Sequence, residues 1–243
     1  MLQNLITHYL MPLFKDITKG FLNVLFPITC VCCGIEGIFI CVHCSKGLKR
    51  VSHQECIVCH KQNLFGITHS GCRKRYIPDG HLSFFDYHDK NVSKIIIIGK
   101  YSFLPGVFKQ LGITISQILY NEYSFVCKNS FVTPVPLSKK RYRWRGFNQA
   151  QLLCESFSQQ LGLDLCHALV RTKNTQTQKN LKRESRIVNV KDAFSFAASV
   201  KIKNKTILLV DDVATTGSTL LEAAKILKQN GAGIVWCISI AKD

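Results

Sequence analysis

The stretch that decides the fold is Ile207-Leu-Leu-Val-Asp-Asp-Val-Ala-Thr-Thr-Gly-Ser-Thr219. Its aliphatic start, Thr206–Val210, predicts a buried strand, and Gly217–Gln229 has the apolar spacing of a helix. A loop of small and hydroxyl residues joins the two. In open α/β sheets, ligands bind at the carboxyl ends of the strands. The adjacent carboxylates Asp211 and Asp212 are therefore predicted to lie at a ligand site.

The chemistry of this loop favours a ligand that carries both a phosphate and a diol. Backbone N–H groups, the positive end of the following helix and the hydroxyls of the loop suit a phosphate monoester. Asp211 and Asp212 would repel that phosphate, so they are expected to accept hydrogen bonds from sugar hydroxyls or to approach Mg²⁺. The alternative interpretation is an ordinary capping turn between a strand and a helix.

The same unit of strand, loop and helix recurs outside this stretch, which predicts a parallel sheet covered by helices. The expected strands are His81–Tyr87, Phe131–Val135 and Ile234–Ile240, and Asn148–Leu161 is an expected helix. For Val92–Ile98 and Phe108–Leu119 the pattern leaves helix and strand open.

Composition favours a soluble, basic, folded protein. The 243 residues include 32 Lys and Arg against 15 Asp and Glu, a net charge of +17, and 47% are hydrophobic, which excludes a wholly disordered chain. The longest aliphatic block, Ile95–Ile98, fits one buried strand and is far shorter than the roughly 20 apolar residues of a membrane span. Met1–Phe26 is expected to be a docking helix, with a membrane-surface or partner helix as the alternative, and it lacks the features of a secretory signal.

Eight of the twelve cysteines lie between Cys30 and Cys72, and their pairing predicts metal binding more than disulfides. Paired knuckles with two-residue spacing are typical of structural zinc sites, in which a histidine can replace one thiolate. Cys32 and His60 are competing ligands, and unligated cysteines or an iron–sulfur cluster are the alternatives. The predicted ligands of one or two zinc ions are Cys30, Cys33, Cys41 and Cys44, and then Cys56, Cys59, His69 and Cys72.

Two basic stretches suggest a polyanionic partner. Lys139–Arg145 holds five cations in seven positions, interleaved with Tyr142 and Trp144, and Arg171–Arg186 holds six cations against Glu184. Cations that neutralise phosphates, together with aromatic rings that stack on bases, suit a single nucleic-acid strand. The alternative is that these charges serve pyrophosphate or form a solvated face, and that Trp144 packs in the core.

A resemblance joins these observations. Val210–Thr219 resembles the 5-phosphoribosyl-1-pyrophosphate (PRPP) motif of type I phosphoribosyltransferases, with Ala214 as a mild departure. The chain from about Phe26 to Ala241 resembles the ComF family of competence proteins, which joins a cysteine-rich zinc module to a phosphoribosyltransferase-like domain. The further residues that carry this resemblance are Val135–Gln149, Arg171–Gln178, Leu181, Arg186, Asn189 and Phe194.

The resemblance implies an α/β fold: a type I phosphoribosyltransferase-like parallel sheet flanked by helices, with an N-terminal double zinc-ribbon module. The expected domains are an N-terminal helical segment over 1–27, the zinc-ribbon module over 28–78 and the phosphoribosyltransferase-like domain over 79–243.

The resemblance also implies site residues. Asp211 and Asp212 would face the ribose and would be the catalytic residues of an enzyme. The predicted PRPP-binding residues are Asp211, Asp212, Ala214, Thr215, Thr216, Gly217, Ser218 and Thr219, with Lys139, Lys140 and Arg141 on the pyrophosphate. The predicted DNA-binding residues are Lys139, Lys140, Arg141, Arg143, Trp144, Arg145, Lys179, Lys182, Arg183 and Arg186.

The function implied is that of a competence protein that handles single-stranded DNA during natural transformation and binds PRPP with Mg²⁺. It would act in the cytoplasm, with the inner face of the membrane left open as its location, and a competence helicase or membrane DNA channel would be a partner. The alternatives are a true phosphoribosyltransferase that acts on an unknown acceptor and releases pyrophosphate, and a binding protein whose DNA affinity is set by PRPP.

Overall fold

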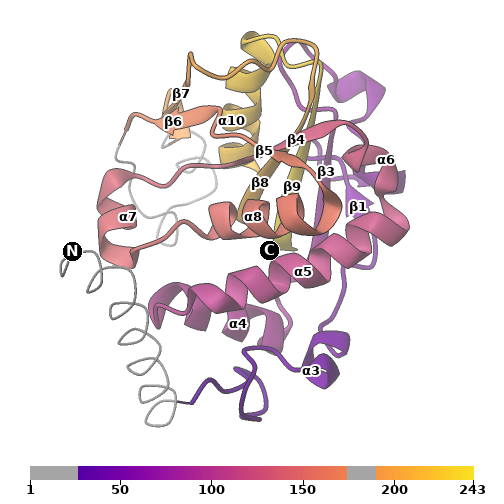
Figure 1. The fold of residues 1–243 in the computed structure, drawn as a ribbon. Helices are drawn as coiled ribbons and strands as arrows, with labels where there is room; N and C mark the ends of the chain where they lie inside the picture. The colour runs from indigo at the N-terminus through magenta and orange to yellow at the C-terminus, as the bar shows by residue number, and fades with distance from the viewer. Residues whose placement is uncertain (1–26, 174–189) are drawn as a thin grey trace, which may run out of the picture. The chain divides into compact units, whose positions relative to one another are not determined.

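The computed structural model describes residues 27–173 and 190–243 (Figure 1). The chain divides into two compact units, Met1–Lys46 and Gly47–Asp243, and each is considered by itself. The N-terminal helix expected over Met1–Phe26 lies outside the described residues. The domain boundaries predicted at 27/28 and 78/79 stay predictions.

In the described part of the first unit, a tight turn and one short helix bring cysteines together. The backbone N–H of Gly34 donates to the carbonyl of Cys30 at 2.8 Å, which closes the turn. The helix α3 spans Val42–Lys46. Thr29 and Glu36 form an isolated antiparallel bridge, which brings the chain back on itself before that helix begins.

The second unit is built on a five-stranded sheet in the order β3-β9-β8-β4-β5, and all its pairs are parallel. This confirms the predicted α/β class. The continuous aliphatic runs of β8 and β9 are buried, as parallel strands covered on both faces should be. The strands are β3 (Gly80–Asp86), β4 (Ser130–Pro134), β5 (Asp164–Leu165), β8 (Thr206–Ala214) and β9 (Ile234–Lys242).

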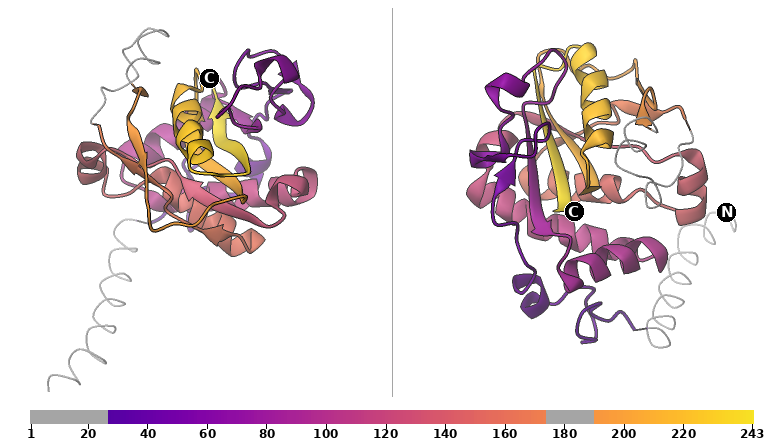
Figure 2. Two further views of the ribbon diagram at one scale, coloured as in Figure 1. Left: turned by 90° about the horizontal axis from the view of Figure 1, so that it is seen from above. Right: turned by 180° about the vertical axis from the view of Figure 1, so that it is seen from behind.

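Two helices cover opposite faces of this sheet (Figures 1 and 2). Helix α8 (Gln149–Leu161) connects β4 to β5, and α10 (Ser218–Gln229) connects β8 to β9. The two crossovers leave the sheet in opposite directions from the adjacent strands β4 and β8. That divergence is a topological switch point, where the loops after the two strands part and leave a crevice.

The segments whose type the sequence left open are both helices: the second packs against α8, and the first packs against the second. Helix α4 spans Lys90–Tyr101 and α5 spans Pro105–Glu122. The aliphatic block Ile95–Ile98, whose length also fits a buried strand, lies inside α4. Ile95 and Ile96 are buried there while Ile97 is 40% exposed, so a helix face and not a strand accounts for the four isoleucines.

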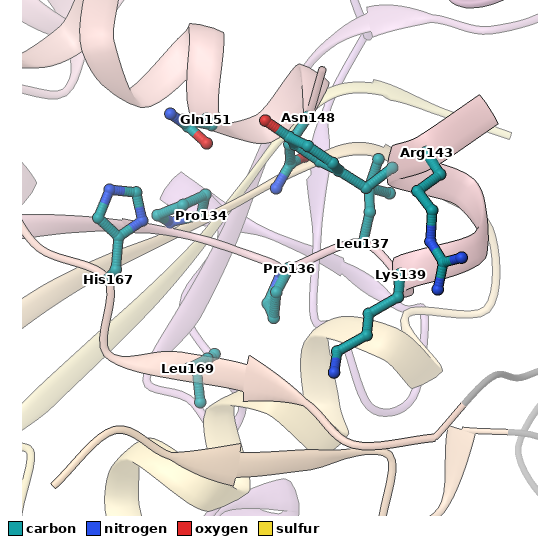
Figure 3. Close-up of a pocket in the computed structure, with 10 residues that line it drawn as sticks. Pro134, Pro136, Leu137, Lys139, Arg143, Asn148, Gln151, His167 and Leu169 are labelled. Carbon is teal, nitrogen blue, oxygen red and sulfur yellow. The ribbon is translucent and has the colours of Figure 1, made fainter. Parts of the chain in front are cut away.

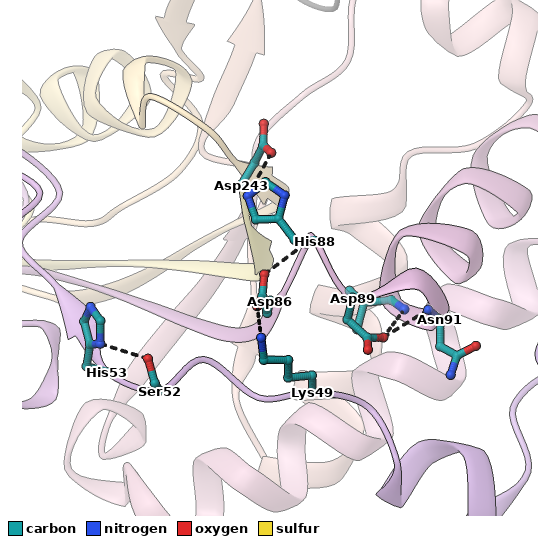
Figure 4. A network of polar contacts seen from close by, with 9 residues as sticks. Lys49, Ser52, His53, Asp86, His88, Asp89, Asn91 and Asp243 are labelled. Atoms are coloured by element: carbon teal, nitrogen blue, oxygen red, sulfur yellow. Dashed lines mark hydrogen bonds and ion pairs between the residues drawn. The ribbon is translucent and has the colours of Figure 1, made fainter.

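A polar network fixes where α4 begins (Figure 4). Asp89 Oδ1 accepts hydrogen bonds from the backbone N–H groups of Asn91 and Val92 at 3.0 and 2.9 Å, which caps the helix. Asp86, the last residue of β3, accepts from His88 N at 2.9 Å and pairs with Lys49 at 2.8 Å. The start of α4 is thereby tied to the carboxyl end of the sheet.

Smaller elements complete the second unit. The cysteine-rich part has β1 (Gln54–Glu55), β2 (Gln62–Asn63) and the short turns η2 (Leu64–Gly66) and η3 (Ser70–Cys72). The others are α6 (Ser124–Cys127), α7 (Lys139–Arg145), and the antiparallel pair β6 (Leu169–Arg171) and β7 (Phe194–Phe196). No helix among the described residues is long and apolar enough to cross a bilayer.

Candidate functional site

The cysteine-rich segments form two clusters that can hold metal ions. Within each cluster, one ligand atom from every residue lies within 4.8 Å of the others. Cys30, Cys33, Cys41 and Cys44 form the first cluster, in the first unit. Cys56, Cys59, His69 and Cys72 form the second, in the unit that contains the sheet. The clusters contain neither Cys32 nor His60, the two residues that sequence reasoning left as competing ligands.

The geometry of both clusters fits a small tetrahedral ion. Four ligands at about 2.3 Å from zinc lie about 3.8 Å from one another. The sulfurs of Cys33 and Cys41 are 3.7 Å apart, and Cys59 Sγ lies 3.2 Å from His69 Nδ1. Backbone N–H groups also point at the thiol of Cys56: burial raises its pKa, but these donors outweigh burial and the net pKa falls to about 6. A thiolate is the form that binds a metal.

A cavity of about 380 Å³ opens at the carboxyl ends of β4 and β8, at the switch point of the sheet. It is lined by Asp211 and Asp212, which lie inside β8 near its carboxyl end, and by the segment from Val135 to Leu137 after β4. Ligand cavities of this class of sheet are expected here, because diverging loops leave a crevice.

The two carboxylates of this cavity differ in environment. Asp211 Oδ1 accepts the backbone N–H of Asp212 at 2.9 Å, and Asp212 Oδ1 accepts that of Val213 at 2.7 Å. Burial raises the pKa of Asp211 to about 7, and the neighbouring charge of Asp212 adds to the rise. Asp211 is therefore an acceptor whose charge is costly until a ligand donates hydrogen bonds to it.

Asp212 is held by a cation that comes from a distant part of the chain. Lys100 Nζ, near the end of α4, lies 2.8 Å from Asp212 Oδ2, and the two side chains are 16% and 17% exposed. A partly buried pair of this kind fixes the carboxylate in one orientation. Sequence reasoning missed Lys100, because no local pattern marks a lysine whose partner is 112 positions later.

Three guanidinium groups also line this cavity: those of Arg141, Arg145 and Arg171. Burial lowers the pKa of Arg171 to about 10, and the charge of Arg141 adds to the fall; burial also lowers the pKa of Arg145 below its ordinary value. The Nε of Arg145 is buried with no hydrogen-bond partner among the described residues. Phosphate oxygens are the natural acceptors for such a group.

The loop after β8 is braced from behind by the second cysteine cluster. Gly217, at the start of α10, has a φ of +71°, and a Cβ at this position would lie 2.9 Å from Cγ1 of Ile57. Ile57 follows Cys56 directly and is 3% exposed. Glycine is thus required twice here, by the left-handed backbone and by the close approach of the cysteine knuckle.

The predicted phosphate-binding residues divide between two cavities. Thr215 and Thr219 line the cavity of Asp211, whereas Thr216 and Ser218 line a neighbouring one with Ile57, Val58 and His60. Thr216 Oγ1 donates to Ser218 Oγ at 3.0 Å, and Ala214 is buried. Lys140 lines neither cavity.

The predicted basic stretch 139–145 is a helix, α7, with aromatic rings that face solvent. Trp144 is 53% exposed, so it is not a core residue. Its ring centroid lies 5.7 Å from that of Tyr101 and 5.5 Å from that of Phe103, both of which sequence reasoning missed. The Arg145 guanidinium lies 5.8 Å from the Tyr101 ring centroid. We call Tyr101, Phe103 and Trp144 the aromatic patch.

The backbone at Phe103, one residue of this patch, is in a strained conformation. Phe103 has a φ of +55° and its side chain is 51% exposed. A bulky residue in the left-handed region is a genuine outlier, and such strain clusters at functional sites. The other basic residues predicted to bind DNA, Lys179, Lys182, Arg183 and Arg186, lie outside the described residues.

Comparisons with known proteins agree with this geometry. The model of the phosphoribosyl transferase domain family matches residues 149–243. Competence protein F of Haemophilus influenzae is 34% identical over 212 residues, which are 79% of this chain and 92% of that protein. Competence protein ComFC of Bacillus subtilis is 29% identical over 205 residues, 79% of each chain.

A third relative matches a shorter part of the chain at higher sequence identity. DNA utilization protein YhgH of Escherichia coli is 40% identical over 110 residues, which are 44% of this chain and 48% of that protein. The parallel sheet, the two cysteine clusters and the long match to Competence protein F lead to one conclusion: this chain belongs to the ComF family of competence proteins, with a phosphoribosyltransferase-like domain.

Proposed function

We propose that this protein handles single-stranded DNA during natural transformation and binds PRPP with Mg²⁺ in the cavity of Asp211. The two clusters, one of four cysteines and one of three cysteines and a histidine, would hold structural zinc. Four protein ligands fill the tetrahedral shell of zinc and leave no position for a reacting water. The protein would act in the cytoplasm, and a helicase or membrane channel of the DNA-uptake apparatus would deliver the strand.

The charge arrangement of the cavity supports PRPP as the ligand. PRPP carries a 5-phosphate, a pyrophosphate and a ribose diol. Arg141, Arg145 and Arg171 offer donors for the phosphates, and Asp211 offers an acceptor for the diol. Mg²⁺ would bind pyrophosphate oxygens, since it prefers phosphate and carboxylate ligands and keeps several waters.

The observation that carries the DNA-binding part is the double role of α7. Arg141 and Arg145 line the PRPP cavity, while Trp144 of the same short helix joins the exposed aromatic patch. Exposed rings beside cations form a stacking platform for unpaired bases. Because the two sites share a helix, ligand binding at one is expected to change affinity at the other.

The aromatic patch predicts a specific loss of strand binding. Trp144→Ala should weaken binding of a labelled single-stranded oligonucleotide by roughly 5- to 150-fold, because each stacked base contributes about 1–3 kcal/mol. Fluorescence anisotropy at two salt concentrations, with and without Mg²⁺ and PRPP, measures this. Tyr120→Ala is the matched control, since Tyr120 is 70% exposed and lies outside the patch. Equal binding by the Trp144 variant and wild type would contradict the proposal.

The raised pKa of Asp211 predicts a pH dependence of PRPP affinity. Its pKa is about 7, so the carboxylate ionises mainly between pH 6 and 8. Asp212 opposes this ionisation, while Lys100 and Arg171 favour it. If only the ionised form accepts the diol, PRPP affinity should rise about tenfold from pH 6 to pH 8.

Isothermal titration at pH 6, 7 and 8 measures this dependence. PRPP itself gains charge in the same range, so Asp211→Asn supplies the baseline. An identical pH profile for Asp211→Asn and wild type would show that Asp211 is not the titrating group.

A further inference from the structure

Another cavity, of about 320 Å³, lies beside the PRPP cavity and shares a wall with it. We call it the second cavity; it is not the one lined by Thr216 and Ser218. Pro136 and Leu137 line both cavities. Helix α7 divides its side chains between them at helical spacing: Lys139 and Arg143 line the second cavity, four residues apart, and Arg141 and Arg145 line the first. The five cations of α7 are therefore not one undivided basic surface.

The side chains of the second cavity are segregated by chemistry (Figure 3). Lys139 and Arg143 lie at one end, and Gln151 and His167 lie at the opposite end. Flat or apolar side chains lie between these ends. They include Pro134, Pro136 and Leu169.

The polar side chains of Asn148, Gln151 and His167 differ in freedom. Asn148 holds the wall, because its Nδ2 donates to Val135 O at 3.0 Å and its Oδ1 accepts from Ala150 N at 3.1 Å. Gln151 is anchored by a hydrogen bond of 3.0 Å from its Nε2 to Glu155 Oε1. Its amide and the exposed imidazole of His167 can each donate and accept a hydrogen bond.

This order of chemistry matches one class of ligand. A planar base suits flat apolar walls, its edge needs both donors and acceptors, and an attached phosphate needs cations. None of the described residues that line the cavity carries a carboxylate, so nothing in its lining repels a phosphate. A purely apolar ligand would leave the two cations unused, and a bare anion would leave the apolar walls unused.

We propose that the second cavity binds one nucleotide of the single strand, with the base between Pro134, Pro136 and Leu169. The base edge meets Gln151 and His167, and the phosphate meets Lys139 and Arg143. The identity of the ligand rests on the proposed DNA-handling function, but the cavity is distinct from the PRPP cavity and from the aromatic patch. The strand therefore contacts the patch by stacking and inserts one nucleotide behind the wall of Pro136 and Leu137.

The first test uses free ligands on the full chain. Wild type should bind thymidine 5′-monophosphate about tenfold or more tightly than thymidine, and Arg143→Gln should remove this preference. His167→Ala should weaken binding of both ligands, while His53→Ala, outside the cavity, should not. PRPP affinity should stay within about twofold of wild type in His167→Ala, which shows that the variant is folded.

The second test does not depend on any variant. A single-stranded oligonucleotide with one 5-iododeoxyuridine is irradiated with the protein, and mass spectrometry locates the crosslinked residues. Crosslinks at Tyr142 or His167, both in the lining of the second cavity, support the proposal.

Two outcomes separate this inference from the proposed function. If the strand binds but crosslinks occur only in the aromatic patch, and thymidine 5′-monophosphate does not bind at millimolar concentration, the cavity is not a nucleotide site while DNA handling stands. If thymidine 5′-monophosphate binds but no strand binds at either salt concentration, the cavity does not take its nucleotide from a DNA strand. That result would contradict both this inference and the DNA-handling function.

Discussion

Asp211→Asn should lose PRPP affinity by roughly 10- to 150-fold, because a hydrogen bond to a charged acceptor contributes about 1.5–3 kcal/mol. The substitution keeps the shape of the side chain and its Oδ1, which accepts the backbone N–H of Asp212. It removes the negative charge of the carboxylate that would accept hydrogen bonds from the ribose hydroxyls. Titration of Mg²⁺ and PRPP into the variant at pH 8, where wild-type Asp211 is largely ionised, measures the loss.

The same substitution should not lower the stability of the protein. The folded-state pKa of Asp211, about 7, lies above the ordinary value of 3.8. Between these pH values the folded state keeps a proton that the unfolded state has lost, so the contribution of Asp211 to stability is present below pH 4 and lost as the pH rises through 7. At pH 8, Asp211→Asn should therefore unfold thermally at or above the wild-type temperature.

The control for this experiment is Asp164→Asn, an exposed aspartate in β5 at the edge of the sheet. It should retain wild-type PRPP affinity. If Asp211→Asn binds PRPP as tightly as wild type, Asp211 does not contact the ribose. If it binds weakly but also unfolds at a much lower temperature, the loss is a folding defect and the assigned role is wrong.

Loss of metal from the second cysteine cluster should abolish PRPP binding, whereas loss from the first should not. Cys72→Ser removes a residue from the cluster whose knuckle carries Ile57, and Ile57 packs against Gly217 in the loop after β8. Apparent metal binding energies at structural zinc sites are about 10–16 kcal/mol and are coupled to folding. Without the ion, the brace behind the loop is expected to loosen.

The first cluster provides the matched control. Cys44→Ser removes the corresponding ligand from the unit Met1–Lys46, which does not contain the cavity. Zinc content by elemental analysis should fall by about one ion per chain in each variant, while calorimetry should show PRPP binding lost only in Cys72→Ser. Retained PRPP affinity in Cys72→Ser after confirmed loss of the ion would contradict the bracing role of Ile57.

The sequence predicted those elements whose structure depends on residues close together in the chain. The aliphatic strand before Asp211, the helix that follows Gly217 and the paired cysteine knuckles depend on neighbours within a few positions. The sequence left helix and strand open for the four isoleucines Ile95–Ile98, because a short apolar run fits a buried strand or a buried helix equally well. In the structure this segment is a helix, in which Ile95 and Ile96 are buried and Ile97 is exposed.

The amino-acid sequence by itself determined the class of the protein: a parallel α/β sheet, a pair of adjacent carboxylates after a buried strand, and two four-residue sets that can hold metal ions. These follow from periodicity and spacing, which are local. The tertiary structure alone decided that Lys100 holds Asp212, that Ile57 braces Gly217, and that four of the five cations of α7 are divided between two cavities. Such pairs join residues far apart in the chain, and their contacts depend on how strands order in the sheet and how helices pack on it, which no local pattern encodes.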